Sequence, residues 1–303
     1  MDDVDTDPAA KLRMLGDTRA LREHVVDVLS SRCGLETLFQ NDDCTLGVRT
    51  SSVLLLLGEQ APRNGGPPEI CVILNKRSKE VKQPGDLCCP GGAVESRFDS
   101  WYARLLALPG TPLSRWPCWS GLRRDEPERA DFLSLLLAAG VRESWEEMRL
   151  NPFRLKFLGP MPSQCLILFR RVIHPMVVWV SRQKKYRLSW EVERIVRIPV
   201  RALLNPYNYA TYRLFVPPHM EWRFRGKTVD FPCFVYCHDG RAELLWGVTF
   251  RIVTLFLEMA FGFALPDPAT LPLVPASLDE DYVNGRHNGN HGRGRPETAA
   301  PSH

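Results

Sequence analysis

The sequence predicts a mixed α/β sandwich, in which a mixed β-sheet carries helices on both faces. Short runs of branched apolar residues alternate along the chain with longer stretches of helical periodicity. Their order is three strands, a loop, a helix, two strands and a second helix. The 303 residues can hold one large domain with extensions or two small domains, and no internal repeat indicates a solenoid.

The composition narrows the classes of function. Hydrophobic residues make up 44% and charged residues 24%, as in ordinary globular proteins. A net charge of +4 is too small to indicate nucleic-acid binding. No apolar run approaches the roughly 20 residues of a membrane span, and the polar start MDDVDTDP resembles neither a secretory signal nor a transit peptide. Nine cysteines, without zinc-site spacing, indicate reduced thiols. We therefore expect a cytoplasmic protein without a membrane or nucleic-acid partner.

The chain begins with a predicted helix and two predicted strands. Leucine and valine recur with near-helical spacing over residues 8–31, so residues 1–46 are predicted to form an N-terminal helical extension. It would pack on the core or on a second subunit, as in a homodimer. Residues 47–58 and 69–75 are rich in branched residues and are predicted to be buried strands. The following polar segment ends in Pro90-Gly91-Gly92, a turn whose bare backbone can approach another group.

Residues 96–130 differ from their surroundings because they combine tryptophans, prolines and a charged run. We interpret them as an inserted loop or lid with some helix, the alternative being a plain surface excursion. A helix is then predicted to start at Asp131, a good N-cap residue, and to end before Asn151-Pro152. Gly140 weakens this helix, and a close packing contact is one reason for a glycine there.

The second half of the chain contains further predicted strands at 157–160, 165–179, 212–216, 221–224 and 233–236. The segment 190–206 begins acidic, becomes apolar and ends at Asn205-Pro206. An apolar helix follows a Trp-Gly turn within residues 244–263. Residues 266–303 change from a proline-rich stretch to an Asn, Gly, His and Arg tail. Such a composition cannot bury enough apolar surface to fold, so this segment is predicted to be a disordered C-terminal tail.

The helix before Asn151 carries a distinctive charge pattern, R-E-x-x-E-E, formed by Arg142, Glu143, Glu146 and Glu147. A helix turns ~100° per residue, which places the three carboxylates within an arc of ~100°. Like charges this close repel each other unless a cation lies between them, and Mg²⁺ takes carboxylates together with substrate phosphates. The alternative is a solvated acidic face.

Together with Gly91 and Gly92, this pattern resembles the box of the Nudix hydrolases, G-x5-E-x7-R-E-U-x-E-E-x-G-U, where U is apolar. The resemblance implies a Nudix-type α/β/α sandwich over residues 47–265, with Mg²⁺ or Mn²⁺ as cofactor. In this chain Arg142 lies much farther from Gly92 than in the common box, so residues 96–130 form an insert inside it. The first glutamate of the box has no clear counterpart, Ser144 replaces an apolar residue, and Arg149 replaces a glycine.

The stretch ILNKRSKEVKQPGDLCCPGG resembles the additional signature of the coenzyme A diphosphatase branch of that family. This resemblance implies hydrolysis of coenzyme A or acyl-CoA to phosphopantetheine and adenosine 3′,5′-bisphosphate. Cleavage of another nucleoside diphosphate derivative, such as ADP-ribose or a dinucleotide, is the first alternative. A non-catalytic Nudix-fold binding module is the second.

The resemblance also implies roles for individual residues. Glu143 and Glu147 would be metal ligands, with Glu146 as the third and the Gly91 carbonyl as a further oxygen. Arg142 would pair with Glu146 one helical turn away and hold it in place. The general base would be one of these glutamates, Glu191 or Glu193. The substrate phosphates would be bound by Lys76, Arg77, Lys82 and Gly92.

Overall fold

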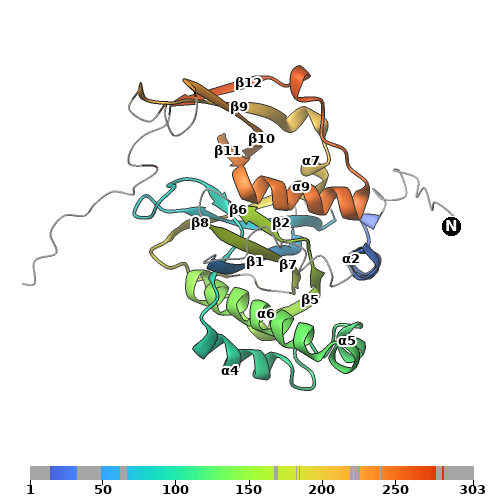
Figure 1. The fold of residues 1–303 in the computed structure, drawn as a ribbon. Coiled ribbons are helices and arrows are strands. Elements are labelled where there is room, and N and C mark those ends of the chain that lie inside the picture. The colour runs from blue at the N-terminus through green and yellow to red at the C-terminus, as the bar shows by residue number, and fades with distance from the viewer. Residues whose placement is uncertain are drawn as a thin grey trace, which may run out of the picture.

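A computed structural model describes residues 14–32, 49–61, 67–166, 170–181, 183, 185–218, 221, 226–238, 240–277 and 282. Within them the chain forms a large mixed sheet with helices on both faces, which confirms the predicted α/β sandwich, and a second, four-stranded sheet (Figure 1). No helix in this part of the chain is long and apolar enough to cross a membrane.

The large sheet is built around β1 (Arg49–Gln60). This strand runs antiparallel to β2 (Glu69–Arg77) and parallel to β7 (Arg171–Val180). The remaining strands of this sheet are β3 (Leu87–Cys88), β4 (Gly91–Ala93), β5 (Leu155–Pro160), β6 (Gln164–Leu166) and β8 (Val192–Pro199). Of these, β4 pairs with β1, β3 and β8 pair with β2, and β5 and β6 pair with β7.

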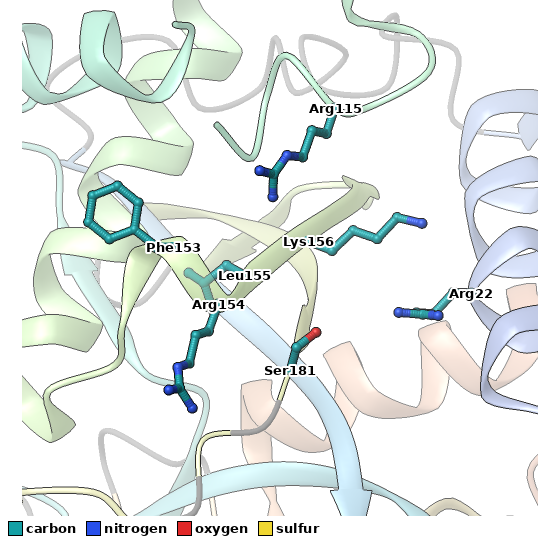
Figure 2. A pocket seen from close by; sticks show the side chains of 7 residues that line it. All are labelled: Arg22, Arg115, Phe153, Arg154, Leu155, Lys156 and Ser181. Atoms are coloured by element: carbon teal, nitrogen blue, oxygen red, sulfur yellow. The ribbon is translucent and has the colours of Figure 1, made fainter. Parts of the chain in front are cut away.

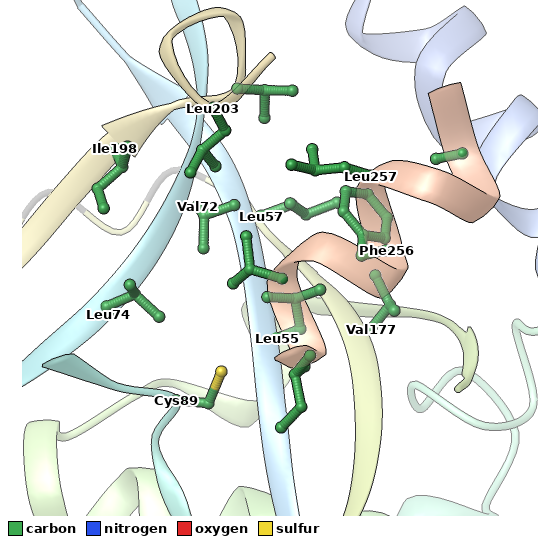
Figure 3. Close-up of a cluster of buried hydrophobic side chains, with 14 of the residues drawn as sticks. Leu55, Leu57, Val72, Leu74, Cys89, Val177, Ile198, Leu203, Phe256 and Leu257 are labelled. Atoms are coloured by element: carbon green, nitrogen blue, oxygen red, sulfur yellow. The ribbon is translucent and has the colours of Figure 1, made fainter. Parts of the chain in front are cut away.

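Helices cover both faces of this sheet, and the alternation of side chains along β1 explains its continuous run of leucines. Leu55 and Leu57 face α2 (Thr18–Arg32) and α9 (Gly247–Phe261), whose side chains complete one core (Figure 3). Leu54 and Leu56 face α6 (Pro127–Met148) and form a second core. The N-terminal helix α2 therefore packs on the core of its own chain; residues 1–13 and 33–48 lie outside the described part.

The segment predicted as an inserted loop or lid is an ordered helical layer. It contains α4 (Ser96–Leu106) and α5 (Trp119–Asp125), which lie against α6 on the side away from the sheet (Figure 1). Trp116, in the loop that connects them, is buried and donates its indole N–H to the Leu158 carbonyl at 3.2 Å. Helix α6 also starts earlier than predicted, with Pro127 in its first turn, and Asp131 forms an ion pair with Arg123 instead of a cap.

The C-terminal half forms the second sheet, in the order β11-β10-β9-β12. Its strands are β9 (Tyr209–Phe215), β10 (Thr228–His238), β11 (Arg241–Trp246) and β12 (Leu273–Ser277). Short helical turns elsewhere are α7 (Val200–Leu203), η2 (Pro152–Arg154), η4 (Pro206–Asn208) and η6 (Pro268–Thr270). Of the predicted strand at 221–224, only residue 221 is described.

Two predictions are wrong in part, one for the C-terminal segment and one for the redox state of the cysteines. The segment 266–303 was predicted to be disordered, yet residues 273–277 form β12, because an open sheet edge supplies main-chain hydrogen bonds that need no apolar side chains. Tyr282 also contacts Asp86; residues 278–281 and 283–303 lie outside the described part. Cys165 is disulfide-bonded rather than reduced, since folding brings together cysteines whose sequence spacing gives no such indication.

The buried histidine of β7 makes stability depend on pH. His174 is 5% exposed, its Nδ1 has no hydrogen-bond partner among the described residues, and burial lowers its pKa from 6.5 to about 4. The unfolded chain therefore binds a proton between these values that the folded chain does not. We expect this group to remove up to about 3 kcal/mol of stability as the pH falls from 6.5 to 4. Urea unfolding of the wild type and of His174→Gln at pH 7.5 and 4.5 tests this. The free energy of unfolding should fall less in the variant than in the wild type, and equal falls would contradict the prediction.

Candidate functional site

The glycine turn and the charged helix meet, as the sequence predicted. Gly91 and Gly92 pair with Val53 and Ser52 of β1. Gly91 has a φ of +144°, and a Cβ there would lie 2.6 Å from the Val53 Cα, so only glycine fits. A Cβ on Gly92 would lie 2.5 Å from the carboxylate carbon of Glu143. The Glu143 carboxylate therefore lies directly against bare backbone, although residues 96–130 separate the two in sequence.

Helix α6 reaches this position because of two small residues on its buried side. A Cβ on Gly140 would lie 2.7 Å from Leu54 Cδ2 and 3.1 Å from Ser52 Oγ, which confirms the predicted close packing contact. Ser144 is fully buried and donates its hydroxyl to the Gly140 carbonyl at 2.6 Å. Ser144 replaces an apolar residue of the box, and its buried hydroxyl has its hydrogen-bond partner within the helix.

Glu147 lies at the centre of the site. Its carboxylate accepts hydrogen bonds from Asn75 Nδ2 at 2.8 Å and from the Gly91 N–H. Burial and the neighbouring charges of Glu143 and Glu191 raise the pKa of Glu147 to about 8, which the Gly91 N–H and Arg77 only partly offset. A proton or a metal cation at Glu147 would relieve both the burial of its charge and its repulsion from the two neighbouring carboxylates.

A cavity of about 70 Å³ opens beside Glu147. It lies between the end of β2, the loop after it and the start of β8. The lining residues are Asn75, Arg77, Val81, Cys88, Glu147, Glu191 and Val192. The amide oxygen of Asn75 is buried and has no hydrogen-bond partner among the described residues. A cavity with two carboxylates, a guanidinium and an unused carbonyl-type oxygen is suited to a phosphate group and a cation.

Arg142 is turned away from this cavity and towards the insert. Its Nε donates to Asp99 at 2.8 Å, and its terminal nitrogens contact the Ala93 carbonyl at 3.0 Å, Glu143 at 3.1 Å and Glu146 at 3.3 Å. The predicted pair with Glu146 is therefore present, but the Asp99 side chain, 0% exposed, is the buried partner. The sequence analysis missed Asp99, because a contact across 43 residues leaves no periodic signal.

Glu146 does not join the other two glutamates. Its side chain is 55% exposed and lies against Arg142, so the structure does not bring this predicted third metal ligand into the cavity beside Glu147. The three carboxylates cover an arc of ~100° on the helix, which is wide enough for one of them to face solvent while another faces the cavity. Within the described residues, no group of three or more His, Cys, Asp or Glu side chains has the geometry of a metal site.

Of the three predicted phosphate-binding cations, one lines the cavity. Side chains alternate along β2, so Asn75 and Arg77 face the site while Lys76 points to the other side and pairs with buried Glu243 at 3.1 Å. The side chain of Lys82 is exposed, and its carbonyl instead accepts from Arg77 Nε at 2.8 Å. The predictions for Lys76 and Lys82 are therefore corrected, whereas Arg77 is placed at the site.

The two candidate general bases outside α6 differ in their position relative to the cavity. Glu191 lines the cavity and acts on the charge of Glu147, whereas Glu193 is exposed and lies 3.5 Å from Arg194. Asn75 is the second residue that sequence reasoning missed. A predicted strand extended to residue 77 would have placed Asn75 and Arg77 on one face, which was the available signal.

The left-handed residue that ends α6 gives a stability test. Arg149, which replaces the glycine of the box, has φ 53° and ψ 44°, and its guanidinium lies 5.2 Å from the Trp145 ring centre. Arg149→Gly and Arg149→Ala both remove the ring contact, but only glycine relieves the backbone strain. We expect the glycine variant to be more stable by about 1 kcal/mol in urea unfolding. An alanine variant of equal or higher stability would contradict the left-handed cap.

Comparison with known proteins gives only distant similarities. No family model matches the sequence, and no curated protein matches it. Among solved structures, a C. elegans Ap4A hydrolase complex is 14% identical with a TM-score of 0.31, covering 52% of this chain and 84% of that chain. A NUDIX hydrolase from Alicyclobacillus acidocaldarius is 17% identical with a TM-score of 0.34, covering 52% and 81%.

A third solved structure is the NUDIX domain of Shewanella oneidensis NrtR complexed with ADP ribose. It is 13% identical with a TM-score of 0.32, covering 56% of this chain and 86% of that chain. Similarities this low carry no argument about activity, so the geometry of the site has to support a function by itself.

Proposed function

We propose that residues 47–265 form a metal-dependent hydrolase of the Nudix type, which cleaves the diphosphate linkage of coenzyme A or an acyl-CoA. The observation that supports this most is the contact of Glu143 and Glu147 with Gly91 and Gly92. The R-E-x-x-E-E helix closes on the glycine turn despite the insert, which is the arrangement that the box requires.

The donor groups fit a hard divalent cation. Glu143, Glu147 and Glu191 offer only oxygen atoms, and the pKa of Glu147 is raised first by burial and then by the charges of Glu143 and Glu191. Mg²⁺ commonly binds through one or two carboxylates and completes its coordination with water and substrate phosphates. Two protein ligands, Glu143 and Glu147, are therefore enough to hold Mg²⁺ or Mn²⁺ in this proposal. Such an ion neutralises phosphate oxygens and lowers the pKa of bound water.

The protein's own groups would divide the remaining work. Arg77 donates charge-assisted hydrogen bonds to a phosphate in the cavity. Asn75 and the Gly91 N–H orient Glu147, and Arg142 orients Glu143 from the insert side. Glu191 is the candidate to accept the proton of the attacking water, because it lines the cavity just before β8, and among the described residues it has no hydrogen bond to Glu143 or Glu147.

A panel of substrates tests this proposal. The purified chain is incubated with Mg²⁺ or Mn²⁺ and coenzyme A, acetyl-CoA, ADP-ribose or diadenosine tetraphosphate, and the products are separated by chromatography. The proposal expects adenosine 3′,5′-bisphosphate and phosphopantetheine from coenzyme A. Cleavage of only the other compounds would indicate a different nucleoside diphosphate substrate.

A binding module without catalysis is the second candidate. It is favoured by the lack of a three-carboxylate metal group among the described residues and by the ordered insert within the box. Calorimetric binding of coenzyme A or ADP-ribose, without product under any metal condition, would select this candidate over the hydrolase.

A further inference from the structure

A second, larger cavity lies at the opposite edge of the large sheet. It has a volume of about 470 Å³ and is formed by α2, the loop between α4 and α5, and the start of β5 (Figure 2). The lining residues are Arg22, Arg115, Phe153, Arg154, Leu155, Lys156 and Ser181. The cavity shares no residue with the candidate active site, so whatever it binds does not depend on the proposed function.

Basic residues are the majority of those that line this cavity, although carbon atoms supply most of its inner surface. Four of its seven residues are Arg or Lys, and none is Asp or Glu. Among the described residues, Arg22, Arg115 and Lys156 form no salt bridge, and the Lys156 side chain extends towards Arg22 while Arg115 points in from the insert (Figure 2). Like charges held around one hollow repel each other, and a bound anion removes that repulsion.

Arg22 is held in place by its own side-chain contacts, whereas Lys156 is positioned only through its strand. Arg22 donates its Nε to the Thr18 carbonyl at 3.0 Å, and its guanidinium lies 5.4 Å from the Trp179 ring centre. Lys156 lies on β5 opposite the same Trp179. The Arg22 charge is therefore presented at a fixed position before any ligand arrives, which lowers the entropy cost of binding.

We propose that this cavity binds a small molecule carrying two or more linked phosphates, either an inorganic polyphosphate or a nucleoside polyphosphate. Guanidinium groups match phosphate geometry, and several of them together suit several phosphates. The volume lies in the ~300–1,000 Å³ range of small-molecule sites, whereas a nucleic-acid backbone or a membrane surface is met by a more extended basic face. Phe153, 82% exposed on the rim, offers a ring on which a nucleobase can stack.

Calorimetric titration of the full-length chain in metal-free buffer tests the proposal. The probes are inorganic tripolyphosphate and the non-hydrolysable nucleotide adenosine 5′-(β,γ-imido)triphosphate. The pocket variant is Arg115→Glu with Lys156→Glu; the matched control, Arg241→Glu with Arg251→Glu, reverses two exposed charges elsewhere. A third variant, Arg77→Gln, reports binding at the candidate active site. Circular dichroism and urea unfolding confirm that each variant is folded.

The proposal expects the pocket variant to bind at least one probe about tenfold or more weakly than wild type, with the control and Arg77→Gln within about twofold. Tighter binding of the nucleotide, lost in Phe153→Ala, identifies a nucleoside polyphosphate; equal binding of both probes identifies the polyphosphate alone. The proposal is overturned if the wild type and the pocket variant bind both probes with equal affinity. It is also overturned if only Arg77→Gln loses binding of the probes. Binding of an oligonucleotide or anionic vesicles, but of neither probe, also overturns it.

Discussion

Replacing Glu147 by glutamine is expected to lower kcat/KM for the diphosphate substrate by at least about a hundredfold. The glutamine has the same shape, and its amide oxygen still accepts hydrogen bonds from Asn75 Nδ2 and the Gly91 N–H. What it removes is the negative oxygen that a cation needs. Because burial and two neighbouring carboxylates already disfavour that charge, the variant should fold at least as stably as the wild type at pH 7.5.

Glu146→Gln is the matched control, since it makes the same chemical change one residue earlier on the same helix. Glu146 is half exposed and contacts Arg142 rather than the cavity, so we expect activity within about tenfold of wild type. Steady-state kinetics with Mg²⁺ and Mn²⁺ distinguish the two variants. Full activity in Glu147→Gln, or equal losses in both, would contradict the roles given to these residues.

Replacing Arg142 by leucine is expected to cost about 3–5 kcal/mol of stability. The Asp99 side chain is 0% exposed, and Arg142 is its cation. Without Arg142 the buried carboxylate loses its cation and keeps the Glu95 N–H, at 2.6 Å, as a hydrogen-bond donor. The contact also joins α4 to α6, so its loss should loosen the insert and expose it to proteolysis before the rest of the domain.

The double variant Arg142→Leu with Asp99→Leu separates the charge effect from simple loss of contact. Removing both partners leaves no unpaired buried charge, so much of the lost stability should return. Urea unfolding of the wild type, both single variants and the double variant gives the coupling energy directly. Additive losses, with no recovery in the double variant, would mean that the ion pair does not hold the insert on α6.

The sequence was sufficient for the features that depend on local pattern. The glycine turn and the R-E-x-x-E-E spacing carried the resemblance that placed Gly91 and the glutamates at one site, and in the structure Glu143 lies against Gly92. The spacing could not fix the rotation of α6 about its axis, which decides that Glu147 faces the cavity and Glu146 faces solvent. That rotation is set by the packing of Gly140 on Leu54, a contact between distant parts of the chain.

Other features were beyond sequence reasoning for related reasons. The predicted strand that became β2 ended at residue 75, so the alternation that separates Lys76 from Arg77 was not applied to them. Asp99 lies in an insert whose own pattern gives no indication of its partner. The strand β12 depends on main-chain hydrogen bonds to β9, and composition, which predicted disorder there, reports on side chains alone.

The most direct test of the proposed metal-dependent site is an anomalous difference map from crystals of the wild-type chain grown with Mn²⁺. We expect a peak within about 2.2 Å of carboxylate oxygens of Glu143 and Glu147, beside the Gly91–Gly92 turn and away from Glu146. The same peak should be missing from crystals of Glu147→Gln. A peak elsewhere, or no peak while Glu147 remains bonded to Asn75, would contradict the account.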